Sequence, residues 1–135
     1  MDKKFFKKII AQSPEDLQII SAVCSEAKVK TSEIKYLPSN KIFLLSLVRF
    51  DKENESNKKS IHSIIKFEFI ESSKSKNIDQ NSPKLLMELI AIDVFKKELN
   101  FEITLLFSKN RIITLSSEVI EVTLEDQKLK DDKNN

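Results

Sequence analysis

The sequence predicts an α+β fold in which one N-terminal helix packs on a mostly antiparallel, strongly bent sheet or small barrel of about six to seven strands. Two observations predict it: the clearest helical spacing lies in residues 13–27, and apolar residues alternate with period two over most of the rest. A pleckstrin-homology-like barrel has a similar order of elements. We assign residues 1–126 to a single globular domain and residues 127–135 to a flexible polar tail.

The helix is predicted from its start signals. Ser13 is a good N-cap, Pro14 suits the first helical position, and two acidic residues follow at the positive end of the helix dipole. The apolar face then comprises Leu17, Ile20, Cys24 and Ala27. Before the helix, lysines interrupt the apolar residues of "MDKKFFKKIIAQ", so we expect no export signal there. An edge strand is favoured over a segment that contacts an anionic membrane.

A hairpin is predicted at "KYLPSNKIFLLSLVRF", residues 35–50. Pro38 presets the backbone for the turn, and Asn40 tolerates a left-handed conformation better than most residues. We expect Asn110 to act in the same way between the strands of a second hairpin. The strand after the first turn is apolar on both faces, which is typical of a central strand.

The other strand assignments are less regular. "IHSIIKFEFIESSKSKNI", residues 61–78, is expected to be a strand that bends or breaks near Phe67. Residues 117–126 fit a strand through their β-branched residues and a helix through the spacing of their glutamates, and the strand is slightly favoured.

Composition limits the classes of function. The 23 basic and 21 acidic residues give a net charge of +2, well below that expected of a dedicated nucleic-acid-binding protein. The chain has no glycine, and its only arginines are Arg49 and Arg111. We interpret both features as drift in an A+T-rich genome, so that lysine density alone does not indicate a binding patch. The single cysteine favours a cytoplasmic location.

No catalytic or metal-binding motif is present. One histidine and one cysteine cannot assemble a zinc site in a monomer, and a chain without glycine has no glycine-rich phosphate loop. A Cys24–His62 dyad is conceivable on paper, but Cys24 fits a small core residue better. We therefore expect no catalytic residue, metal or cofactor.

The two arginines are the most informative polar residues. Where lysine has replaced arginine almost everywhere, a surviving arginine is a candidate for a role that needs its planar fork. For Arg49 we favour a structural clamp on a carboxylate over binding of an anionic ligand. A structural role is favoured more strongly still for Arg111.

Several stretches of the sequence resemble a bacterial family catalogued as domain of unknown function 2948. They are, in order, "EDLQIISAVCSEAKVK", "IKYLPSNKIFLLSLVRF", "SKNID", "LMELIAI" and "SEVIEVTLED". The resemblance implies a single cytoplasmic domain and supplies no catalytic residue. It points to Asp79 and Asp126 as family-like positions, and hence as candidate partners for Arg49. The family tends to have glycine near Asn77 and in the turn at "SKN", where this chain does not.

Taken together, these features predict a non-catalytic binding module that engages a protein partner through a strand edge or a sheet face. Arg49, Asp79 and Asp126 are its candidate binding residues. The alternative is an enzyme, or enzyme subunit, that uses carboxylates and Arg49 on a small anionic ligand. We expect neither nucleic acid nor membrane as a partner, with weak lysine-driven binding of RNA or anionic lipid as a third option, and we leave a homodimer open.

Overall fold

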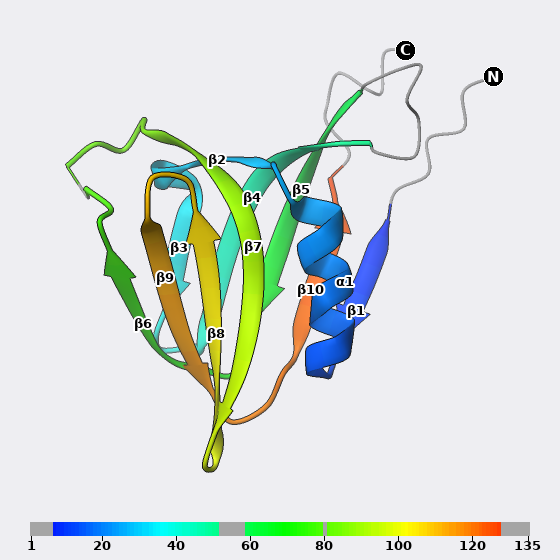
Figure 1. Cartoon of the computed structure of the whole chain (residues 1–135), viewed down its shortest axis with the longest axis vertical. Helices are drawn as coiled ribbons and strands as arrows, with labels where there is room; N and C mark the ends of the chain where they lie inside the picture. Colours follow the sequence, from blue (N-terminus) through cyan, green and yellow to red (C-terminus); the bar gives the residue numbers. More distant parts are fainter. Residues whose placement is uncertain (1–6, 52–58, 80, 128–135) are drawn as a thin grey trace.

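The computed structural model describes residues 7–51, 59–79 and 81–127. Within them the chain forms ten strands, one α-helix and one 3₁₀ turn (Figure 1). In chain order these are β1 (Lys8–Ala11), α1 (Pro14–Cys24), β2 (Lys28–Lys30), η1 (Thr31–Glu33), β3 (Ile34–Leu37), β4 (Ile42–Phe50), β5 (Ser60–Phe67), β6 (Ile70–Lys76), β7 (Leu86–Lys97), β8 (Asn100–Phe107), β9 (Arg111–Ser117) and β10 (Val122–Asp126).

Among the described residues all strand pairs are antiparallel, and the sheet has two free ends. Its order is β1-β10-β5-β4-β2-β7-β8-β9-β6, with β3 paired to β4 outside this path. The expectation of a strongly bent sheet or small barrel of about six to seven strands is therefore wrong, because the described residues form a sheet of ten strands that does not close. The pleckstrin-homology-like barrel is wrong for the same reason.

Two of the predicted strands are each divided in two. The stretch from Val29 to Leu37 is interrupted by η1, whose Thr31 N–H donates to Leu85 O at 3.0 Å instead of continuing the ladder with β4. The stretch after residue 60 breaks at Phe69, which has a left-handed φ of 61°. The chain then leaves β4 and β10 and pairs with β9 instead.

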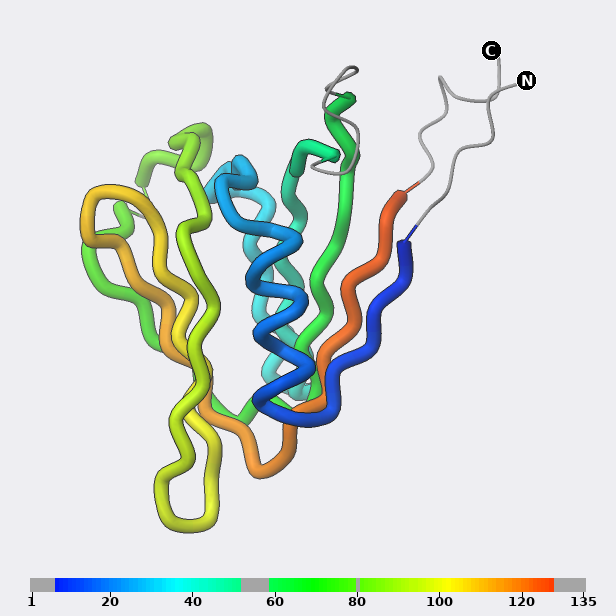
Figure 2. The backbone as a smooth tube through the Cα atoms, turned by 45° about the vertical axis from the view of Figure 1, so that its right-hand side comes forward, coloured from blue at the N-terminus to red at the C-terminus, as the bar shows by residue number. Residues whose placement is uncertain are grey.

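The sheet consists of two groups of strands around one core. β3, β4, β5, β10 and β1 form the first group, and β7, β8, β9 and β6 form the second (Figure 2). Three-residue β2 joins the groups at one end, pairing with β4 at Lys28↔Val48 alone. The connections from β5 to β6 and from β9 to β10 cross at the other end, where Glu68 N–H donates to Glu121 O at 2.9 Å. The inward side chains of both groups form a single hydrophobic core.

Helix α1 covers one side of the space between the two groups, next to β7 and β1 (Figure 1). Ser13 caps it as predicted, because its Oγ accepts from Asp16 N–H at 3.1 Å. The predicted apolar face is fully buried, including Cys24, and the predicted core position of Cys24 is thus confirmed. Ser21 Oγ accepts a hydrogen bond of 2.9 Å from Ile92 N–H, so the helix also provides an acceptor for a backbone N–H at the edge of β7.

Turns in this glycine-free chain use left-handed residues of other types. Seven described non-glycine residues have positive φ, among them Lys109 and Asn110 in the β8–β9 turn. In the β3–β4 turn the left-handed residue is Lys41, and the prediction of Asn40 was one position off. Asn77 also has positive φ, so both places where the resemblance implies glycine are left-handed here.

Candidate functional site

Arg49 lies on the inner face of β4, in line with Phe43, Leu45 and Leu47. It is 2% exposed, which is rare for an arginine unless its charge is paired. The partner is Asp126 at the end of β10, and Ser63 on the intervening strand β5 lies beside both. The alternation that places apolar residues in the core thus also brings Arg49 to Asp126.

The side chains of Arg49, Ser63 and Asp126 form short hydrogen bonds with one another. Arg49 Nη2 donates to Asp126 Oδ2 at 2.8 Å and to Oδ1 at 3.0 Å, and Nε donates to Oδ1 at 3.3 Å. Ser63 Oγ donates to Asp126 Oδ1 at 2.7 Å. Lys7 N–H donates to Asp126 Oδ2 at 2.8 Å and ties the start of β1 to the same carboxylate. The predicted clamp between Arg49 and Asp126 is confirmed.

In this geometry both charged groups form their hydrogen bonds within the protein itself. The carboxylate of Asp126 accepts from three other residues, and the side chains of the pair are 3% and 0% exposed. A buried pair of this kind is held by its hydrogen bonds and has no face open to solvent. The ligand-binding role for Arg49 and Asp126 stays a prediction that this arrangement does not support.

Asp79 lies elsewhere, in the segment between β6 and β7, and does not contact Arg49. Its Oδ1 accepts from Asn81 N–H at 2.9 Å, and its Oδ2 accepts from Ser82 Oγ–H at 3.2 Å. These bonds form a turn of the kind that aspartate side chains make with the backbone two residues on. Ser82 O in turn accepts from Thr31 Oγ1 at 2.6 Å, which fastens the turn to η1.

A groove of about 440 Å³ lies on the side of the sheet between β3 and β6. β3 pairs only with β4, and β6 pairs only with β9, so each has an edge that no described strand occupies. One end of the groove is closed where Tyr36 Oη donates to Ile70 O at 3.0 Å. Asp79's turn and η1 bound the other end, because Ile78, Pro83 and Thr31 are among the lining residues.

The groove is lined by both apolar side chains and hydroxyls. Its apolar lining comprises Ile34, Tyr36, Phe43, Ile78, Pro83 and Ile113. Its hydroxyl lining comprises Thr31, Ser32, Ser73 and Ser75. The volume lies within the range of roughly 300–1,000 Å³ that is usual for ligand sites, and apolar walls with a few polar groups are typical of them. Among the described residues, no carboxylate, histidine or cysteine lines this groove.

Sequence reasoning missed most of the groove. The stretch "SSKSK" on β6 was counted as part of a plain strand, but its alternation places Ser73 and Ser75 on the face that also carries Ile113 and Leu115. That alternation was a usable signal. The approach of β3 to β6 was not, because it depends on the split at Phe69.

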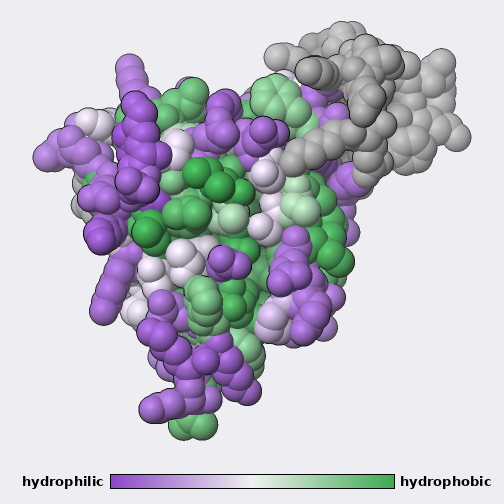
Figure 3. Space-filling view, viewed as in Figure 1, coloured by the Kyte–Doolittle hydropathy of each residue, from purple (hydrophilic) through white to green (hydrophobic). Residues whose placement is uncertain are grey.

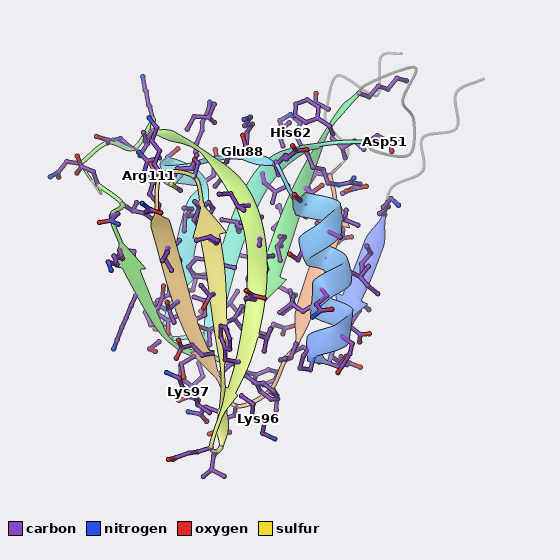
Figure 4. All side chains as sticks on the ribbon, in the orientation of Figure 1. Asp51, His62, Glu88, Lys96, Lys97 and Arg111 are labelled. Atoms are coloured by element: carbon purple, nitrogen blue, oxygen red, sulfur yellow. The ribbon has the colours of Figure 1, made fainter. Side chains whose placement is uncertain are left out.

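The remaining residues that the sequence offered for catalysis or metal binding lie outside the groove. Cys24 is fully buried at the end of α1, whereas His62 is on the exposed face of β5 and lies between Arg111 and Asp51 along the upper end of the sheet in Figure 4. Within residues 7–51, 59–79 and 81–127, no three or more histidine, cysteine or acidic side chains are arranged to hold a metal ion. In the same residues no helix has the length and apolar character needed to span a membrane.

The fold and the groove define a mostly antiparallel β protein with one covering helix and an open seam in its sheet. The chain belongs to the family described as protein of unknown function (DUF2948), whose family model matches residues 7–134. This match confirms the resemblance drawn from the sequence. No curated protein matches the chain. A crystal structure of an uncharacterized protein from Neisseria gonorrhoeae is similar, with 15% sequence identity, a TM-score of 0.44, and coverage of 88% of this chain and 97% of that chain.

Proposed function

We propose that the protein is a non-catalytic binding module of the bacterial cytoplasm that holds an extended segment of a protein partner in the groove between β3 and β6. The observation that carries the proposal is the contrast between the two open sides of the sheet. On one side α1 fills the space and accepts a hydrogen bond from the edge of β7. On the other side the β3–β4 turn reaches β6 at Ile70, whose N–H donates to Lys41 O, and beyond that point no described strand covers the edges of β3 and β6.

An extended segment fits the chemistry of such a seam. Half of the backbone N–H and C=O groups of an edge strand point away from its single neighbour and can pair with an added strand. In this mode of recognition the backbone supplies affinity, and pockets for alternate side chains supply specificity. Tyr36 and Ile78 would then contact an apolar side chain of the partner, with Ser73 and Ser75 available for its polar atoms.

Selection of peptides on the purified protein tests the proposal. A displayed library of random linear peptides is panned on the full chain, and enriched peptides are measured by calorimetry against two variants. Ser75→Trp fills the groove from an exposed position. Thr104→Trp is the matched control, because Thr104 lies on β8, on the face of the sheet opposite to the groove lining, and pairs with Asp93 and Thr114.

We expect enriched peptides to bind the parent and Thr104→Trp within twofold of each other, and to lose binding to Ser75→Trp. Equal binding to Ser75→Trp would place the peptide site elsewhere on the molecule. A library that yields no binder to the parent would also count against the proposal, since a strand edge recognises the backbone that every peptide has.

A further inference from the structure

Arg111 is the second arginine of the chain, and its environment differs from that of Arg49. It begins β9 on the same face as Ile113, which lines the groove. Figure 4 shows it at the end of the sheet near the segment between β6 and β7. Among the described residues no hydrogen bond or ion pair engages its guanidinium. A planar fork of donors without an acceptor is suited to receive a carboxylate.

Lysines flank the groove on both strands. Lys35 on β3 and Lys74 and Lys76 on β6 alternate with the lining residues Tyr36, Ser73 and Ser75 and are exposed. The same end of the sheet, around β6 and β9, is covered by hydrophilic side chains (Figure 3). These three lysines have no carboxylate partner among the described residues, whereas ion pairs engage Lys28, Lys41, Lys66 and Lys97.

We infer that the segment held in the groove is acidic: an apolar side chain enters between β3 and β6, and carboxylates on either side of it meet Arg111 and the flanking lysines. This inference rests on the proposed function and adds the chemistry of the partner. The reason is the distribution of charge and not its amount, because the whole chain carries only +2. Unpaired cations on both sides of an apolar site favour acidic partners and disfavour basic ones.

A nucleic acid fits the same surface less well. Binding of single strands relies on exposed aromatic side chains on which bases stack. The only aromatic residues that line the groove are Tyr36 and Phe43; Phe43 is 1% exposed, and the hydroxyl of Tyr36 is engaged with Ile70. The free strand edges, by contrast, match a peptide backbone.

The test compares two synthetic peptides of about nine residues that share a central valine–leucine pair and carry either glutamates or lysines at the other positions. Their Kd values for the full chain are measured by calorimetry at roughly 50 and 150 mM salt. The variants are Lys35→Glu/Lys74→Glu and Arg111→Gln. The control Lys59→Glu/Lys96→Glu changes the net charge by the same amount as the first variant, at exposed positions that do not line the groove. Oligouridylate RNA is added as a competitor.

The expected result is that the acidic peptide binds at least about tenfold more tightly than the basic one, and that Lys35→Glu/Lys74→Glu reverses this order while the control keeps it. Arg111→Gln should weaken the acidic peptide about fivefold. Equal affinity of the two peptides, with binding blocked by Ser75→Trp, would overturn the inference and leave the proposed function standing. Acidic-peptide binding that Ser75→Trp leaves intact would overturn both. Displacement of the acidic peptide by RNA at 150 mM salt would also overturn the inference.

Discussion

Arg49 on β4 and Asp126 on β10 are 77 residues apart in the chain and meet across the strand that separates them. Ser63 on that strand, β5, pairs with Asp126 in one ladder and with Leu47 in the other, and it hydrogen-bonds both charged groups. Three neighbouring strands are thereby joined by side chains as well as by backbone. Lys7 N–H adds the start of β1 to the same carboxylate.

Replacement of Arg49 should lower the stability of the fold. Arg49→Lys is expected to cost about 1–2 kcal/mol, because lysine cannot reproduce the forked contact with Asp126. Arg49→Ala should cost about 3–5 kcal/mol, since it leaves a buried carboxylate without its counter-charge. Urea unfolding followed by circular dichroism measures both. Arg111→Lys is the control and should change stability by less than about 0.5 kcal/mol. An Arg49→Lys variant as stable as the parent would refute the structural clamp.

Glycine at a left-handed position should stabilise this chain. Lys109 has a φ of 60°, where a residue with a β-carbon is strained by roughly 1–2 kcal/mol. Lys109→Gly relieves that strain and loses part of the gain to the greater freedom of the unfolded chain, so we expect a net rise of about 0.5–1 kcal/mol. Thermal unfolding provides the measurement. Lys96→Gly, within β7, should instead lower stability by about 0.5–1 kcal/mol, and a loss at both sites would contradict the expectation.

Cys24 should behave as a core residue. It is fully buried as the last residue of α1, so Cys24→Ala is expected to cost about 1 kcal/mol through lost volume while peptide binding is unchanged. The native thiol should react slowly with iodoacetamide and quickly once the protein is unfolded in urea. Rapid stoichiometric labelling of the folded protein would show that the thiol is accessible.

Asp79 should affect the groove and not the core. Asp79→Ala removes the acceptors of Asn81 N–H and Ser82 Oγ–H in an exposed turn, so the cost in stability should be about 0.5–1 kcal/mol. Because Ile78 and Pro83 flank that turn and line the groove, peptide affinity should fall several-fold. Amide hydrogen exchange at Asn81 should also be faster. Unchanged peptide affinity together with faster exchange would show that the turn does not contribute to peptide binding.

What could be predicted from the sequence depends on the range of the interaction. The helix start was predictable because Ser13, Pro14 and the acidic first turn act within a few residues. The strand count was not, because the break at η1 depends on a bond from Thr31 to Leu85, far along the chain. The left-handed conformation of Phe69 could not be predicted from the sequence, since phenylalanine rarely adopts it.

For the candidate functional residues, too, local features could be predicted from the sequence, whereas contacts that depend on the whole topology could not. Arg49 stood out because an arginine in an apolar strand needs a partner, and the resemblance supplied Asp126 as a candidate. Asp79 was named for the wrong contact: it shapes a turn and does not pair with Arg49. The groove lies between two strands that the whole topology brings together. The sequence pattern therefore indicated only the serines of β6 that line it.

The uncovered edge of β6 also bears on how copies of this chain behave toward one another. An unpaired strand edge is a template for aggregation, and natural proteins protect such edges with charged side chains, lysine above all. Lys74 and Lys76 provide that protection, because two such edges brought side by side would place like charges in register. Concentrated protein should therefore stay dispersed through repulsion at this edge and lose that protection when the lysines are neutralised. The side chains that would admit an acidic strand would also oppose fibre growth from the same edge.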